Sequence, residues 1–323
     1  MIVKRLFRLI AFTMAALLLL LAIGLVRAHR QIRGVDPPLP DLAALRVFSD
    51  APDLPVRVSM WNSASQPAPR ASVLDPGRDS DPAQPYVMSH PAFVLEWEDG
   101  RVLLVDAGMD AAQAVAFGRP LGWVGAGAMA PHGSIGEHVA PALAKHPIAI
   151  AFTHLHSDHV GGAVSLCAAL PPASRVRLLQ TPAQMDLVNY TTRPGHALVE
   201  AAGCLVPERV ADAPAAALPD RPGTFVIHAA GHTPGSQIVG AWVRSGAAVR
   251  GILFAGDAAN AIDGIRRDVP KPWAYQTFLV PESEARLARV RALLREAEAA
   301  GMTVAIAHDE RHLASTGIPS FQP

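Results

Sequence analysis

The feature that most constrains this chain is the segment THLHSDHVGG at residues 153–162, which follows directly on the apolar run at 148–152. A short apolar run bounded by polar residues is typical of a buried strand. The segment then places four metal-competent side chains within six positions: His154, His156, Asp158 and His159. Imidazole nitrogen and carboxylate oxygen are the non-thiolate ligands that zinc prefers. The sequence therefore predicts a metal site at the end of a buried strand.

The spacing of these side chains favours two neighbouring metal positions. His154 and His156 are two residues apart, so both can point the same way from an extended loop. Asp158 and His159 follow where the chain turns, so they can face a second point a few ångströms away. The glycines at 161–162 permit a sharp turn and a close approach of the backbone.

Three further residues of ligand type each follow a predicted strand, namely His232, Asp257 and His308. A single histidine after a strand is more often structural. Together with the first segment, however, these residues make a set of five histidines and two aspartates. Such a set suits two zinc ions that share a carboxylate and a water.

The remaining pattern predicts a layered α/β domain. Strands are expected at 56–61, 92–97, 101–105, 148–152, 176–179, 225–229, 236–243, 251–254 and 304–307. The turn at 98–100 makes the second and third of these strands a hairpin, and the polar, proline-rich stretch at 63–85 is expected to be a long loop. Helices are expected at 185–190 and 282–300. Alternating strands and helices of this kind indicate layered α/β architecture.

The motifs together resemble the metallo-β-lactamase fold superfamily, and most of all its quorum-quenching N-acyl-homoserine lactonase branch. The motifs that carry the resemblance occur in the family's order: HxHxDH at 154–159, GHTPG at 231–235, Gly-Asp at 256–257, His-Asp at 308–309, and LVDAGM at 104–109. The resemblance covers about residues 56–312. It implies an αββα four-layer sandwich with the site at one edge, between the two sheets.

The resemblance also implies a role for each candidate ligand. One zinc ion is expected on His154, His156 and His232, a second on Asp158, His159 and His308, with Asp257 bridging both. Asp106 is expected to orient a ligand histidine through its imidazole N–H. The sequence departs from the lactonases at Asn260, where they carry a tyrosine three positions after the bridging aspartate. Asparagine can still donate a hydrogen bond, but its reach is shorter.

The implied activity is hydrolysis of a lactone or related ester by a hydroxide that bridges two zinc ions, with Asp158 and Asp257 as the catalytic carboxylates and Asp158 as the proton carrier. Other divalent transition metals could occupy the same ligands. An apolar substrate pocket is expected to use five side chains: Asn260, Trp61, Met109, Trp123 and Tyr275.

Four alternatives stay open at this point. The same dimetal site suits a phosphoester or organophosphate substrate. A β-lactamase is disfavoured because the second ligand group holds no thiolate, and an iron-dependent oxygen-handling role would need a redox partner domain. A non-catalytic zinc-binding module is disfavoured because structural zinc sites usually contain cysteine.

The N-terminus is predicted to reach a membrane. The apolar run Leu9–Val26 follows basic residues and is near the roughly 20 residues that span a bilayer. Its poor cleavage site, Arg27-Ala28-His29, favours an uncleaved signal anchor over a signal peptide. We therefore expect an anchor or signal peptide at 1–29, a linker at 30–55, and a hydrolase domain at 56–323 on the periplasmic side, or secreted if the N-terminus is cleaved.

Charge and cysteine content narrow the partners. The chain has 28 basic and 28 acidic residues, so its formal net charge is zero. Nucleic-acid binding needs a basic face, and none stands out in the sequence. The expected partners are therefore a small-molecule substrate and, through the N-terminal segment, a membrane. Cys167 and Cys204 form no CxxC pair. Buried free thiols are the favoured interpretation, and a disulfide between them stays open.

Overall fold

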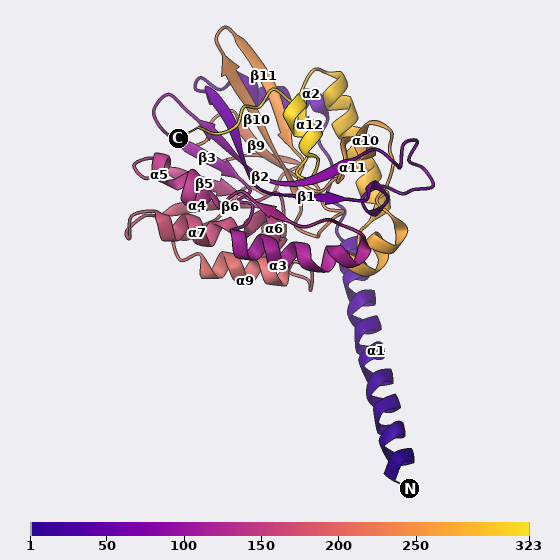
Figure 1. Ribbon diagram of the computed structural model, residues 1–323. Coiled ribbons are helices and arrows are strands. Elements are labelled where there is room, and N and C mark those ends of the chain that lie inside the picture. The colour runs from indigo at the N-terminus through magenta and orange to yellow at the C-terminus, as the bar shows by residue number, and fades with distance from the viewer. Residues whose placement is uncertain (1, 323) are drawn as a thin grey trace.

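The computed structural model describes residues 2–322 as two β-sheets packed between helices, with the long helix α1 projecting from one end of the domain (Figure 1). The strands are β1 (Arg57–Ala68), β2 (Tyr86–Glu96), β3 (Val102–Val105), β4 (Ala130–Pro131), β5 (Ile148–Ala151), β6 (Val176–Gln180), β7 (Leu205–Arg209), β8 (Ala215–Ala217), β9 (Thr224–His228), β10 (Gln237–Ser245), β11 (Ala248–Phe254) and β12 (Thr303–Ala305).

The helices lie at both ends of the chain and between the strands. They are α1 (Ile2–Gly34), α2 (Leu42–Leu45), α3 (Ala111–Leu121), α4 (Ile135–His138), α5 (Ala140–Leu143), α6 (Ser157–Val160), α7 (Gly162–Ala169), α8 (Pro182–Asp186), α9 (Arg193–Ala201), α10 (Ile262–Arg266), α11 (Glu284–Ala299) and α12 (Glu310–Ser315). Shorter helical turns are η1 (Arg46–Asp50), η2 (Arg70–Ser72), η3 (Gly122–Val124) and the π-helical η4 (Tyr275–Leu279).

The strand order places the ends of several strands at one edge. The first sheet has the order β4-β1-β2-β3-β5-β6-β7, and the second has the order β12-β11-β10-β9-β8. In the first sheet, β3, β5, β6 and β7 run parallel, whereas β1, β2 and β3 are antiparallel. In the second sheet, β12 runs parallel to β11. The segments that follow β3 and β5 therefore start side by side.

Successive side chains of a strand face opposite sides of its sheet, and this alternation supplies apolar side chains to the layer on each side. In β3, Leu103 and Val105 belong to the apolar cluster between the two sheets, whereas Leu104 faces the helices outside the first sheet. Phe93 and Phe254 meet across the sheets with ring centroids 4.6 Å apart. Outside the second sheet, Leu253 belongs to a cluster with apolar residues of α11. Helix, sheet, sheet and helix thus form the expected αββα sandwich.

The structure confirms the predicted hairpin, since β2 pairs antiparallel with β3, and the helix predicted at 282–300, which is α11. The loop predicted at 63–85 was wrong at its start, because β1 continues to Ala68 and pairs with β2 from Tyr86 onward. Ser63, Ser65 and Gln66 in this part of β1 are buried, and Ser63 Oγ donates to the His90 carbonyl oxygen at 2.8 Å. The helix predicted at 185–190 is also displaced, because α8 ends at Asp186.

The two cysteines form a disulfide, so the favoured interpretation as free thiols was wrong. Cys167 in α7 is bonded to Cys204, which lies just before β7, with a Cα–Cα distance of 5.3 Å and a sequence separation of 37. The pairing depends on how α7 and α9 pack beside the sheet, which no local pattern in the sequence records.

The N-terminal helix is apolar and long enough to be a signal sequence or a membrane anchor. It continues beyond the apolar run to Gly34. The segment at 30–55, expected to be a linker, lies against the domain: Ile32, Leu45 and Leu54 are buried, and Phe48 stacks on Phe225 at a centroid distance of 4.6 Å. This segment is therefore packed rather than a free tether.

Candidate metal centre

The histidine-rich segment begins at the edge where β3 and β5 end together. Val105 and Ala151 are register partners, so the next residues of both strands are neighbours. The Asp106 carboxylate accepts hydrogen bonds from Thr153 N at 2.7 Å and from Thr153 Oγ1 at 2.8 Å. Asp106 holds a left-handed φ of 59°, a strained conformation for a residue with a side chain. A Cβ on Gly162 would clash with the Ala107 carbonyl, which explains the glycine at that position.

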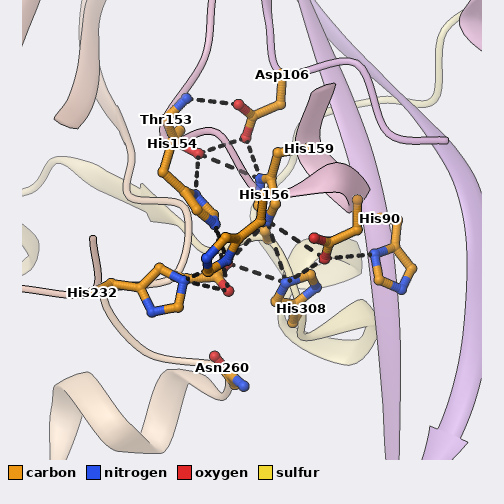
Figure 2. A network of polar contacts seen from close by, with 12 residues as sticks. His90, Asp106, Thr153, His154, His156, His159, His232, Asn260 and His308 are labelled. Atoms are coloured by element: carbon orange, nitrogen blue, oxygen red, sulfur yellow. Dashed lines mark hydrogen bonds and ion pairs between the residues drawn. The ribbon is translucent and has the colours of Figure 1, made fainter. Parts of the chain in front are cut away.

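The seven candidate ligands converge in one cluster between the two sheets (Figure 2). His154, His156, Asp158 and His159 come from the first sheet's edge and α6. The other three follow strands of the second sheet, with His232 after β9, Asp257 after β11 and His308 after β12. All are buried except His156, which is half-buried. Residues up to 154 positions apart in the chain thus meet at one place, from 154 to 308.

The first ligand group consists of His154, His156, His232 and Asp257, whose ligand atoms lie within 4.8 Å of one another. His156 Nδ1 lies 3.0 Å from His154 Nε2 and 3.1 Å from His232 Nε2. Asp257 Oδ2 lies 3.4 Å from His232 Nε2. Zinc–nitrogen bonds of about 2.0–2.1 Å imply ligand atoms roughly 3.3 Å apart in a tetrahedron. The group therefore fits one zinc-sized cation.

The second group surrounds the other oxygen of Asp257. Asp257 Oδ1 lies 3.2 Å from His159 Nε2 and 3.1 Å from His308 Nε2, and these two nitrogens are 3.3 Å apart. Asp158 Oδ2 completes the group at 3.4 Å from His308 Nε2. Among the described residues, Asp257 Oδ1 is buried without a hydrogen-bond partner. A buried acceptor of this kind is satisfied by a cation, so the residues present fit a second ion.

The protonation states of the clustered side chains also favour cation binding. Burial lowers the pKa of His156 to about 4, which leaves a neutral imidazole. Burial opposes ionisation of Asp257, but the nearby histidines, His308 foremost, hold its pKa well below the usual value. Burial also opposes the charge on His159, but the carboxylates of Asp106 and Asp257 raise its pKa overall. A cation bound there takes the place of that proton.

Hydrogen bonds from outside the cluster fix the ligand rings. Asp106 Oδ2 lies 2.9 Å from His159 Nδ1, which matches the orienting role that the resemblance implies for Asp106. His308 Nδ1 lies 2.8 Å from the Ser89 carbonyl oxygen, and His156 Nε2 lies 3.1 Å from Thr191 Oγ1. In each ring, the other nitrogen is left to face the cluster.

A buried lysine–glutamate pair supports His232, and the sequence analysis missed it. Glu282 Oε1 lies 2.5 Å from His232 Nδ1, and Lys271 Nζ donates to Glu282 at 2.7 Å and to the Asp257 carbonyl at 2.8 Å. Burial raises the pKa of Glu282 to about 7, against the opposite pull of Lys271. Neither residue belongs to a motif. The only local signal is that Lys271 stands between two prolines, which restrict the backbone there.

His90 in β2 is a second residue that the sequence analysis missed. Its ring is buried, with Nδ1 3.4 Å from Asp158 Oδ2, and it forms a possible ligand group with Asp158 and His308. Figure 2 shows His90 at one side of the cluster, opposite His232. Burial lowers its pKa to about 4. The strand was expected only at 92–97, so His90 fell outside it, whereas β2 in fact begins at Tyr86.

Removing the charge of Glu282 is expected to weaken the first ligand group. In Glu282→Gln, His232 loses its carboxylate partner and Lys271 is left without a counter-charge, so metal affinity should fall by about 10–100-fold. Competition with a chromogenic chelator measures this. Glu298→Gln, at an exposed pair with Arg266, is the matched control. Equal affinity in both variants would show that the pair does not support the centre.

A cavity of about 350 Å³ opens beside the cluster. It is lined by Met88, Phe117, Leu121, His156, Ser157, Asp158, Tyr190, Thr191, Pro194, Asp257, Asn260, Tyr275, Leu279, Val280 and His308. Asn260 and Tyr275 were among the predicted pocket residues. Most of the apolar lining was missed, because it comes from helix ends and loops that carry no pattern of their own.

The other three predicted pocket residues do not line this cavity. Trp61 stacks on His138 at a centroid distance of 4.1 Å and donates to the Gly133 carbonyl oxygen. Met109 is buried in a small apolar cluster beneath α3. Trp123 is 89% exposed. An aromatic or thioether side chain fills core and surface positions as readily as pockets, so its type alone did not place it.

The comparisons with known proteins agree with this geometry. The family model for the metallo-beta-lactamase superfamily matches residues 85–303. No curated protein matches the chain. Among solved structures, an N-acyl homoserine lactone hydrolase with the product N-hexanoyl-L-homoserine bound at its catalytic metal centre has a TM-score of 0.57 at 16% identity, covering 81% of this chain and 96% of that one.

Two further solved structures share the fold. A mutant of AiiA from B. thuringiensis, with N-decanoyl-L-homoserine bound at its active site, has a TM-score of 0.57 at 15% identity and covers 81% of this chain and 96% of its own. A probable metal-dependent hydrolase from Staphylococcus aureus has a TM-score of 0.51 at 11% identity, with 79% and 91% covered. At these identities the likeness shows the fold alone. Since the family model spans more than half of the chain, and the sandwich and its cluster of histidines and aspartates agree with it, this protein belongs to the metallo-beta-lactamase superfamily.

Proposed function

We propose that this protein is a dinuclear zinc hydrolase that opens a lactone or a related ester. The observation that carries the proposal is the position of Asp257, whose two oxygens each face a separate group of imidazoles. One zinc ion is assigned to His154, His156 and His232, and the other to Asp158, His159 and His308, with Asp257 shared. Ligand sets of histidine and carboxylate without cysteine are typical of catalytic zinc.

Bound cations would supply Lewis acidity and would lower the pKa of a coordinated water. The chain's own residues do the rest of the chemistry. Asp158 lines the cavity and is the carboxylate that moves a proton from the attacking water to the departing alkoxide. The buried ring of His90 lies against that carboxylate, with Nδ1 3.4 Å from Asp158 Oδ2.

The cavity supports an ester with an apolar substituent. Its volume lies at the lower end of the roughly 300–1,000 Å³ range of small-molecule sites. Its apolar lining includes Phe117, Leu121, Leu279 and Val280, which would contact an apolar chain. The ligand end of the cavity holds Asp158, where the carbonyl of the substrate would lie.

Asn260 is proposed to hydrogen-bond the substrate. It is buried, it lines the cavity, and its Oδ1 has no hydrogen-bond partner among the described residues. Asn260→Ala is expected to raise the KM for lactones about fivefold, since a hydrogen bond of this kind contributes about 1 kcal/mol. Metal content should not change. Metal analysis beside steady-state kinetics checks both, and a loss of metal would instead make Asn260 part of the ligand support.

A substrate panel on the metal-loaded full chain tests the function. The panel contains lactones, aryl esters, phosphotriesters and a β-lactam, and His156→Ala serves as the inactive control. Saturable lactone opening is the expected result. Cleavage of phosphotriesters alone would show that the substrate is a phosphoester rather than a lactone. Inactivity on every substrate, with two tightly bound zinc ions, would contradict an enzymatic role.

The proposed location is outside the cytoplasm, with residues 1–29 as an uncleaved anchor and 56–323 as the hydrolase domain. The disulfide between Cys167 and Cys204 supports this, because disulfides persist in oxidising compartments such as the periplasm. The length and apolar character of α1 support the anchor.

A further inference from the structure

The hydrolase domain begins where the apolar part of α1 ends. The apolar run stops at Val26, and Ala28 is already buried against the domain, as is Ile32 one turn later. At 1.5 Å per residue, Ala28 lies only about 3 Å beyond Val26 along the helix axis. If α1 crosses a bilayer, no spacer separates the domain from the membrane surface. The part of the domain that touches α1 must then lie at the level of the lipid headgroups.

The part that touches α1 is η4 and its surroundings. His29 Nε2 lies 3.1 Å from the Thr277 carbonyl oxygen. Next to this contact, Trp273, Phe278 and Leu279 are 71%, 57% and 54% exposed. We call these three residues the apolar rim. Trp273 and Phe278 contact each other edge to face, with ring centroids 5.4 Å apart.

An apolar rim of this kind suits a membrane interface better than water. Tryptophan is enriched at the headgroup level of membrane proteins, where one side of the ring is apolar and the other is wet. Three exposed arginines of α1, Arg27, Arg30 and Arg33, follow the apolar run and can pair with lipid phosphates. Figure 1 shows this part of the domain, in orange, at the upper end of α1, whereas the β10–β11 hairpin lies at the opposite end of the domain.

The same segment lines the cavity beside the candidate metal centre. Leu279 belongs to the rim and also lines the cavity, and its neighbours Tyr275 and Val280 line it as well. Leu121, at the end of α3, lines the cavity too, and the exposed Trp123 follows it two residues later. One short segment therefore touches α1 on one side and the candidate site on the other.

We propose that the apolar rim inserts into the interfacial region of the bilayer leaflet that faces the domain, so that the cavity takes its substrate directly from that leaflet. The substrate class is an amphiphile: an ester or lactone whose apolar chain partitions into the lipid. The substrate part of this proposal rests on the proposed ester hydrolysis, whereas the docking of the rim does not.

The docking is tested by fluorescence on the full chain in nanodiscs of phosphatidylcholine and phosphatidylglycerol. Phe278→Cys carries an environment-sensitive fluorophore, and a phosphatidylcholine spin-labelled near its headgroup is the quencher. Val249→Cys, on the 44% exposed residue of β11, is the matched control. We expect roughly a twofold loss of fluorescence at 278 and none at 249. An equal loss of fluorescence at both positions overturns the proposal. So does a label at 278 that is shielded from both water and the lipid quencher, because a protein partner then covers the rim.

The substrate route is tested with two esters that share one headgroup and differ in the length of their acyl chain. Phe278→Asp should lower kcat/KM about tenfold for a long-chain ester held in vesicles, relative to its short, water-soluble homologue, because a charge opposes insertion of the rim. An equal effect on both chain lengths contradicts delivery from the leaflet. Absence of turnover with either chain in the unmodified protein is a failure of the proposed hydrolysis, and it leaves the quenching result to decide the docking.

Discussion

Asp257→Asn is expected to abolish hydrolysis and to release metal from both ligand groups. The two oxygens of Asp257 face different groups, with Oδ2 3.4 Å from His232 Nε2 and Oδ1 3.1 Å from His308 Nε2. An amide offers one neutral oxygen in place of two charged ones. No anionic ligand is then shared between the two cations, and both are held more weakly. We expect kcat/KM to fall on the order of 10³-fold or more, since both the Lewis acidity and the activated water are lost. Ester kinetics and metal analysis by mass spectrometry measure the two effects.

Asp309→Asn is the matched control for this prediction. Asp309 is also buried and directly follows His308, but its carboxylate caps α12 through the His312 N–H at 2.9 Å and accepts from Ile262 N at 3.0 Å. Its substitution should cost about 1 kcal/mol of stability as a lost cap and leave the metal in place. A normal rate and full metal content in Asp257→Asn would show that this carboxylate is not shared between two ions.

Loss of the Cys167–Cys204 disulfide is expected to destabilise the domain by about 4 kcal/mol. The bond closes a loop with a sequence separation of 37. In the chain-entropy description, opening a loop of that length returns about 13 cal/mol/K to the unfolded chain, which is about 4 kcal/mol at room temperature. The double variant Cys167→Ser, Cys204→Ser in detergent, unfolded with urea, gives this difference in the free energy of unfolding.

Reduction of the unmodified chain provides the control. A reductant should shift the urea midpoint of the unmodified chain to that of the double variant and leave the double variant itself unchanged. Metal content should be the same in all four samples, because the disulfide joins α7 to the segment before β7 and touches no candidate ligand. A midpoint that does not respond to the reductant would contradict the bond.

The metal cluster could be predicted from sequence because its signals are local. The segment at 153–162 carries four candidate ligands in one short stretch, and each remaining candidate directly follows a strand. Ends of neighbouring strands meet at a sheet edge, so residue type and strand position together were sufficient. Asp106 was expected only from the family resemblance, and in the structure it lies beside the start of the histidine-rich segment because β3 and β5 end side by side.

The supporting residues could not be predicted, because their roles depend on packing between distant segments. Lys271 and Glu282 meet His232 only through the fold, and His90 reaches Asp158 from the middle of β2. The polar end of β1 was missed because its side chains find hydrogen-bond partners in β2 and in α3 rather than an apolar face.

Diffraction from zinc-loaded crystals at the zinc absorption edge tests the central claim most directly. We expect two anomalous peaks, one among the ligand nitrogens of His154, His156 and His232, and one between His159 and His308, with Asp257 between the two peaks. A single peak, or peaks away from Asp257, would contradict the shared dinuclear centre on which the proposed chemistry depends.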